Sequence, residues 1–210
     1  MADILQTARA QLAVVGPTAL SLRAIARELG MVSSGIYRYV ASRDELLTML
    51  VTAGYNDLAD AVEAAVAPKG DAPTRFLRGC RAVRAFALAQ PHEYALLYGT
   101  PVPGYAAPQD TIAPATRVYA ALASPLSGHA HADAAAPVPH ALKSDARAIV
   151  DGLPLDADPA TALAFLGALA QLFGLISFEL FGHTNGVISD DDALFDWSVK
   201  ALGRNLGLDA

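Results

Sequence analysis

A short stretch of small, hydroxyl-bearing and basic side chains carries most of the chemistry in this sequence. It reads LGMVSSGIYRYVASRDELL, covers residues 29–47, and lies between segments rich in leucine and alanine. Serine and tyrosine hydroxyls donate hydrogen bonds to phosphate oxygens, and guanidinium groups bind the same oxygens. The combination indicates contact with a nucleic acid.

The order of the residue types predicts what each would contact. Ser33, Ser34 and Gly35 are small enough to let a helix end approach base edges. Tyr37 and Tyr39 supply hydroxyls for the phosphate backbone. Two more phosphate contacts are expected at neighbouring helix ends, Ser21 and Arg43. The pattern alone leaves open an ordinary glycine turn with two half-buried tyrosines.

Three short helices are expected to position these residues. The first ends at Gly16–Pro17, the second follows Ser21 and ends at Gly30, and the third covers about 34–39. A glycine turn between the second and third makes a helix-turn-helix geometry, in which the later helix enters the major groove. A fourth helix starts at a capping box, SRDE at 42–45, and runs to about residue 67.

Helical periodicity continues through the rest of the chain, without strand-like alternation or internal repeats. We therefore predict an all-α protein, with a helix-turn-helix head at residues 1–50 and a helical body at residues 51–210. The body helices are expected at 74–90, a short one around Tyr94 and Tyr98, then 115–123, 140–151, 159–181 and 189–206, with a proline-rich loop at 99–114.

Charge is distributed unevenly between these parts. The chain has 210 residues and a formal charge of −6, yet its first fifty residues hold five arginines against four acidic residues. A near-neutral head on an acidic body argues against a non-specific, architectural DNA binder, which would need a more basic surface. Four arginines recur every third residue and are expected to be solvated or salt-bridged, the alternative being an electrostatic aid to DNA approach: Arg75, Arg78, Arg81 and Arg84.

Several other chemistries find little support. The sequence has no phosphate loop, nucleophile elbow or Cys–His pairing, so we expect neither an enzyme nor a cofactor. The single cysteine, Cys80, fits a reducing cytoplasm and is expected to fill core space rather than sense redox state. Alternating ligands occur at His129, His131 and Asp133, but an alanine-rich loop gives them no fixed partner, so no metal site is expected.

One apolar segment leaves a membrane-associated alternative open. Residues 159–178 include no charged side chain and are long enough to cross a bilayer. Both flanks are acidic and lack nearby Lys or Arg, and the N-terminus lacks the basic start and apolar run of a signal peptide. We therefore expect a helix buried between subunits of a cytoplasmic protein.

Residues 21–50 closely resemble the DNA-binding head of the TetR family of transcriptional regulators. The matching elements are Ile25–Ala26, Leu29–Gly30, the serine pair, Tyr37, Tyr39–Val40 and Ser42–Arg43 with the leucines after it. Segments 91–108 and 174–183 resemble the WHG-type C-terminal domain of some members, although Phe173 stands where the family has Trp and His. The resemblance implies these DNA contacts: Ser21, Arg23, Ser33, Ser34, Gly35, Tyr37, Tyr39 and Arg43.

The resemblance also implies a repressor that binds a palindromic operator as a homodimer and is released by a small-molecule effector. The dimer would form through a four-helix bundle of the last two long helices, since helix 159–181 is apolar on more faces than one subunit can bury. The expected interface residues are Leu163, Leu166, Leu169, Ala170, Gly174, Ser177 and Trp197.

A mostly apolar effector pocket is expected in the middle helices. Aromatic side chains with a few hydroxyls suit such a cavity, although each could simply fill the core. The candidates are Phe76, Phe86, Tyr94, Tyr98, Tyr105 and Phe173. A DNA-binding regulator without a small-molecule ligand is the remaining alternative.

Overall fold

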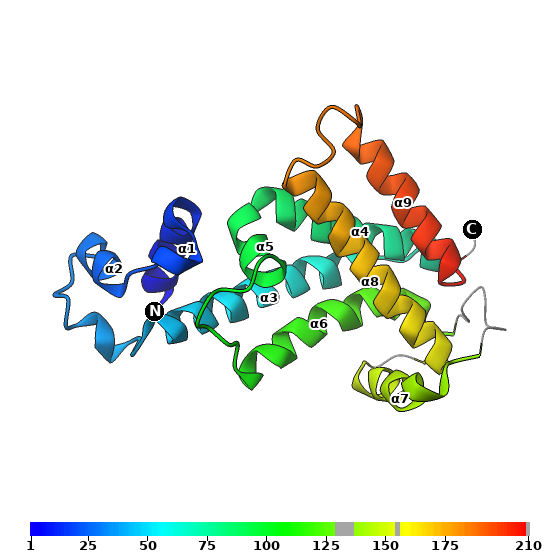
Figure 1. Cartoon of the computed structure of the whole chain (residues 1–210), viewed down its shortest axis with the longest axis horizontal. Helices are drawn as coiled ribbons and strands as arrows, with labels where there is room; N and C mark the ends of the chain where they lie inside the picture. Colours follow the sequence, from blue (N-terminus) through cyan, green and yellow to red (C-terminus); the bar gives the residue numbers. More distant parts are fainter. Residues whose placement is uncertain (129–136, 154–155, 209–210) are drawn as a thin grey trace. The chain divides into compact units, whose positions relative to one another are not determined.

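The computed structural model describes residues 1–128, 137–153 and 156–208, and every regular element in these ranges is a helix (Figure 1). The expected all-α class is therefore confirmed, while His129, His131 and Asp133 lie outside the described residues. The α-helices are α1 Ala2–Val15, α2 Leu22–Glu28, α3 Arg43–Val66, α4 Ala72–Ala89, α5 Pro91–Tyr98, α6 Ile112–Ala123, α7 Lys143–Gly152, α8 Pro159–Leu180 and α9 Asp191–Asn205. Short 3-10 turns are η1 Pro17–Ala19, η2 Ile36–Arg38, η3 Gln109–Thr111, η4 Ser124–Leu126 and η5 His140–Leu142.

The chain divides into two compact units. The first unit contains residues 1–57 and 89–115, and the second contains residues 58–88 and 116–210. The first unit is larger than the fifty-residue head expected from the sequence, because the segment after α4 joins it. Val102 lies in the core of this unit, and Leu96 and Tyr105 pack against that core.

The core of the first unit comes from one apolar stripe on each short helix. These side chains leave water almost completely on folding, which is the main stabilising contribution for elements too short to be stable alone. They are Ile4, Ala8 and Leu12 of α1, Leu22, Ile25 and Ala26 of α2, Ile36 and Val40 around η2, and Leu46, Leu47 and Leu50 of α3.

Local hydrogen bonds fix where α2 ends. Gly30 has φ of 66°, a conformation that glycine adopts without the Cβ penalty of other residues. Its N–H donates to the carbonyl of Arg27, and the N–H of Met31 donates to the carbonyl of Ala26. This is a complete Schellman motif, and it confirms the predicted glycine stop.

The predicted capping box at the start of α3 forms with one change. The N–H of Glu45 donates to Ser42 Oγ at 3.1 Å, as expected. The Glu45 carboxylate, however, accepts a 2.6 Å bond from the N–H of Ala41, one residue before the expected donor. The cap thus satisfies two backbone N–H groups, but its return contact reaches one residue further back.

In the second unit, α8 has one buried and one exposed apolar side. Phe165, Leu172 and Ile176 are buried, whereas Leu166 and Phe178 are exposed. By length and composition α8 is the only helix in the described ranges that could span a membrane, and a third of its most apolar window is buried. Asp158 caps its N-terminus, and although partial burial raises the pKa of this carboxyl, bonds from the Thr161 N–H and hydroxyl and the Ala160 N–H lower it more.

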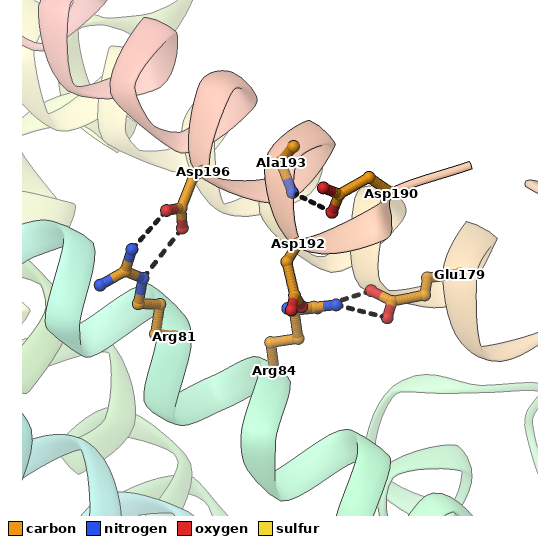
Figure 2. A network of polar contacts seen from close by, with 7 residues as sticks. All are labelled: Arg81, Arg84, Glu179, Asp190, Asp192, Ala193 and Asp196. Carbon is orange, nitrogen blue, oxygen red and sulfur yellow. Dashed lines mark hydrogen bonds and ion pairs between the residues drawn. The ribbon is translucent and has the colours of Figure 1, made fainter. Parts of the chain in front are cut away.

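Carboxylates fix α8 and α9 to the arginines of α4 (Figure 2). The guanidinium of Arg84 forms two 2.7 Å bonds to Glu179 and one 2.6 Å bond to Asp192. Asp196 accepts two bonds from Arg81, which lower the pKa of that carboxyl. The expected salt bridges are therefore confirmed for Arg81 and Arg84, whereas Arg75 and Arg78 donate to the backbone carbonyls of residues 66 and 69.

The start of α9 differs from the expectation by one residue. The sequence predicts a helix from residue 189, but the cap is Asp190, whose carboxylate accepts the 2.9 Å bond from the Ala193 N–H. A carboxylate at this position also interacts favourably with the helix dipole, which a serine hydroxyl does only weakly.

Removing the Arg84 guanidinium should destabilise the protein much more than removing that of Arg81. Arg84 and Glu179 side chains are each 14% exposed, so Arg84→Ala leaves a largely dehydrated carboxylate unpaired. We expect a loss of about 2 kcal/mol in the free energy of unfolding, measured by urea titration. Arg81→Ala is the matched control and should cost less than about 1 kcal/mol, because that side chain is 53% exposed. Equal losses would contradict this account.

Candidate functional site

Most residues of the segment from Ser33 to Tyr39 are exposed on the surface of the first unit. Ser33, Ser34 and Arg38 are exposed, and Tyr37 and Tyr39 are 46% and 52% exposed. These side chains point outward because Ile36, within the segment, and Val40, directly after it, are fully buried in the core of the unit. We call residues 33–39 the exposed row.

The helix expected over residues 34–39 is shorter and tighter than predicted. Residues 33–35 form a turn, and only Ile36–Arg38 make a 3-10 helix. Two serines and a glycine in succession favour helix weakly, and the N–H of Gly35 closes a turn by donating to the Val32 carbonyl at 2.7 Å. The prediction of a regular helix was therefore wrong in this detail.

Gly35 has a second reason to lack a side chain. A Cβ at this position would lie 3.1 Å from the Val32 carbonyl oxygen and 3.3 Å from a Val32 methyl group. These contacts are tighter than ordinary packing, and the carbonyl belongs to the backbone and cannot easily move. The small residue thus shapes the turn itself, in addition to any role in close approach to a ligand.

Ser21 holds the start of α2 and keeps a donor for a ligand. Its Oγ accepts a 3.3 Å bond from the Ala24 N–H, and its own N–H donates to Gln11 Oε1 at 2.6 Å. The hydroxyl proton is not used in this cap, so it can still be donated to an anion oxygen. Arg23, one residue into the helix, is exposed.

The Arg43 side chain makes contacts within the protein that the sequence did not indicate. Its Nη2 donates to the carbonyl of Pro17 at 2.8 Å, and its Nη1 lies 3.8 Å from a carboxylate oxygen of Asp44. The side chain therefore ties the start of α3 to η1. A guanidinium has five N–H donors, so an anion contact remains open to it, but its first role is to hold these elements together.

Two exposed residues of this surface were not singled out from the sequence. Val32 is 74% exposed immediately before the serine pair, and Arg38 lies between the two tyrosines. The spacing of Ile36 and Val40 gives a signal for Arg38, because two apolar residues four apart on a helix place the residue midway between them on the opposite side. Val32 has no such signal, since an apolar residue is expected inside.

The six aromatic residues expected in a pocket belong to two different units. In the first unit, the rings of Tyr94 and Tyr98 lie 5.3 Å apart, and Tyr105 hydrogen-bonds to Thr48 at 3.0 Å. In the second unit, Phe86 is buried, Phe173 packs edge-on against Tyr119, and Phe76 lines a groove of about 240 Å³ between α4 and α9. Each residue thus has local packing partners.

Six of the seven residues expected at a dimer interface are exposed or half-buried on α8 and α9. Leu166, Ala170 and Trp197 are exposed, and Trp197 is 68% exposed despite its size. Leu163, Gly174 and Ser177 are half-buried, whereas Leu169 is buried inside its own unit. A groove of about 420 Å³ is lined by Gln171, Gly174, Leu175, Phe178, Thr184, Leu194, Trp197, Ser198, Ala201, Leu202 and Asn205. We call this surface the α8–α9 face.

Both parts of the chain match known protein families. Residues 4–50 match the model for bacterial regulatory proteins of the tetR family, and residues 76–202 match the model for the tetracyclin repressor-like C-terminal domain. The HTH-type transcriptional regulator Rv1816 of Mycobacterium tuberculosis is 42% identical over 213 residues, covering 96% of this chain and 89% of the relative. The chain belongs to the TetR family of transcriptional regulators.

Solved TetR-like structures agree with this assignment. The regulatory protein SCO4313 superposes with a TM-score of 0.78 at 34% identity, over 96% of this chain and 93% of that one. The TetR family regulator PfmR of Thermus thermophilus has a TM-score of 0.60 at 19% identity, over 99% of each chain, which shows the shared fold. The helix-turn-helix head and helical body are thus those of a DNA-binding transcription regulator, and the family is not one of enzymes.

Proposed function

We propose that this TetR-family protein is a repressor that binds a palindromic operator as a homodimer and is released by a small, mostly apolar effector. The observation that carries the proposal is the exposed row, in which small residues, hydroxyls and a guanidinium face outward from two buried anchors. A surface of this composition fits the major groove and the phosphates beside it.

Each residue of this surface has a proposed contact. The turn residues Ser33, Ser34 and Gly35 approach base edges, because they are small and lie at the start of the row. The hydroxyls of Tyr37 and Tyr39 donate to phosphate oxygens of the DNA backbone. Further phosphate contacts come from Ser21, Arg23, Arg38 and Arg43.

The proposed dimer forms through the α8–α9 face. Exposed Trp197, Phe178 and Leu166 would be costly to leave in water, and a twofold contact would bury them against their copies. At Gly167 and Gly174 an added Cβ would meet nothing within 4 Å, so both glycines leave open space for an approaching helix. Two heads about 34–36 Å apart would then read two half-sites of one operator.

The proposed effector acts by shifting a population of conformations. It needs to bind the DNA-incompetent form only about 1.4 kcal/mol more tightly to reduce operator affinity tenfold. A TetR variant from Acinetobacter baumannii AYE, which has a similar fold, was solved in complex with minocycline, and this supports a small-molecule site in such a helical body. A DNA-binding regulator without a small-molecule ligand is the alternative.

The proposal includes a cytoplasmic location. A membrane-associated regulator would depend on α8 alone, whose buried side packs within the second unit. Fractionation tests this part: recovery of the protein in the salt-washed membrane pellet would contradict it.

Selection of bound DNA from a random library tests the function directly. Full-length protein should enrich a palindrome whose half-sites are about one helical turn apart. Compounds are then screened for release of that DNA. Failure to enrich any sequence would contradict the proposal, and enrichment without any releasing compound would favour the regulator without a ligand.

Val32 should contribute to the sequence preference by contacting a thymine methyl group. The side chain of Val32 is branched, apolar and exposed next to residue 33, so it can pack against the thymine methyl group, which lies in the major groove. Replacing one selected half-site thymine at a time with uracil should weaken wild-type binding about fivefold at one position. The Val32→Ala variant should bind the thymine and uracil forms equally. If it kept the wild-type difference at every position, Val32 would not read the methyl.

A charge on the α8–α9 face should dissociate the dimer. Trp197→Glu places a carboxylate where the proposed interface buries an indole, which costs several kcal/mol per dimer unless the carboxylate stays hydrated. We expect sedimentation velocity to show monomers for this variant and dimers for the wild type. Val187→Glu, on the exposed loop between α8 and α9, is the control and should stay dimeric. A dimeric Trp197→Glu protein would place the interface elsewhere.

A further inference from the structure

One guanidinium in the first unit is shared by two carboxylates from different helices. Arg9 of α1 pairs through Nη2 with Asp57 of α3. Its Nε lies 3.4 Å from Oε1 of Glu93, which belongs to α5. Arg9 therefore connects three helices that are far apart in the sequence and belong to the same unit.

This group of charges is not balanced. Two carboxylates face one guanidinium, and Glu93 is only 8% exposed. Its Oε2 is buried and accepts no hydrogen bond, and Arg9 Nε is buried and makes no hydrogen bond, although Glu93 Oε1 lies 3.4 Å away. A buried charge that lacks partners costs folding free energy, so the ionised form of Glu93 is held at a cost.

The surroundings of Glu93 do not compensate for this cost. A Cβ added to Gly54 of α3 would lie 3.5 Å from Oε2 and 3.5 Å from a Leu97 methyl group, so the unpaired oxygen and an apolar side chain both lie beside Gly54. The charged groups that face Glu93 are Arg9 from α1 and Asp57 from α3, while its neighbour His92 on α5 is exposed.

α1 is also the helix on which the DNA-binding elements are mounted. Gln11 of α1 accepts the N–H of Ser21 at the start of α2, and Ala8 and Leu12 lie in the same core as Ile25. A change in how α1 is held on α3 and α5 therefore reaches α2 and the exposed row, because these elements share one small core.

We propose that Glu93 is a positioning residue that holds α1 on α5 through Arg9, so that neutralising its carboxylate loosens this attachment and weakens operator binding. The inference rests on the proposed DNA-binding function. With Glu93 neutral, Arg9 remains paired with Asp57, and α1 stays attached to α3 but no longer electrostatically to α5.

The pKa of Glu93 makes this a pH-dependent effect. Burial raises the pKa of this carboxyl above its usual range, Arg9 lowers it, and Asp57 raises it further. The folded chain thus binds the proton more readily than the unfolded chain. Stability contributed by this group rises as the pH falls through the raised pKa, whereas operator affinity falls over the same range.

The test measures operator affinity of the full-length protein by fluorescence anisotropy from about pH 8 to about pH 5, with the DNA enriched by the selection above. Wild-type affinity should fall about fivefold as the pH is lowered. Protonation of other groups makes the chain more positive and would raise DNA affinity, so a fall has the opposite sign to this general effect. Glu93→Gln should bind about fivefold more weakly at high pH and lack the fall.

Two further variants test whether Glu93 is the group whose protonation weakens operator binding. Asp57→Asn leaves Arg9 to Glu93 alone, which lowers the pKa of Glu93, so the fall in affinity should move to lower pH. Asp110→Asn removes an exposed carboxylate of the same unit and should reproduce the wild-type profile. A Glu93→Gln protein with the wild-type affinity and pH profile would overturn the inference.

Thermal unfolding separates the inference from the proposed function. Near pH 8, Glu93→Gln should unfold at a higher temperature than the wild type, because the substitution removes a buried and poorly paired charge. If the wild type bound no DNA at any pH, the proposed function would fail, and this unfolding comparison would still test the charge imbalance. A lower unfolding temperature for Glu93→Gln would overturn the description of that imbalance.

Discussion

The burial of Ile36 and Val40 is the constraint on which the proposed DNA-binding surface depends. These two side chains are fully buried in a core built from α1, α2 and α3. The three residues between them are two tyrosines and an arginine, and all three are exposed. The surface is thus a consequence of how a small apolar core is filled.

The backbone around this anchor is fixed by a few specific hydrogen bonds. The Schellman motif at Gly30 ends α2, the contact between Gly35 and Val32 closes the next turn, and Arg43 holds the start of α3 on the Pro17 carbonyl. These contacts restrict a segment whose serines and glycines favour no regular structure. A rigid presentation matters because a side chain that must be ordered on binding reduces affinity.

In the second unit, polar contacts hold one side of α8 and α9, and apolar side chains are exposed on the other side. Arg84 and Arg81 pair with carboxylates of α8 and α9, as Figure 2 shows. The Cζ atom of Arg84 also lies 5.0 Å from the centroid of the Phe195 ring. These pairs fix the inner side of both helices. Trp197 and Phe178 remain exposed on the other side, which leaves an apolar surface that a second copy of the chain can cover.

Local signals in the sequence predicted local structure well, whereas contacts between residues far apart in the sequence could not be predicted from it. Gly30 and the capping box at Ser42 each identify a helix boundary through adjacent residues. The attachment of Arg43 to Pro17 joins residues 26 positions apart and has no periodic signature. The same holds for Arg9, Asp57 and Glu93, since only the packing of three helices brings them together. Leu169 was expected outside and lies inside, because α8 is apolar on most sides and composition cannot choose the buried one.

The most direct measurement of the central claim is the salt dependence of operator binding by the Arg38→Ala variant. If the exposed row contacts DNA, this variant should bind more weakly to all sequences, and the slope of log affinity against log salt should fall by about 1. Arg147→Ala, at an exposed position of α7 in the second unit, should leave both affinity and slope unchanged. An Arg38→Ala protein with the wild-type affinity and slope would contradict the assignment of residues 33–39 as the DNA-binding surface.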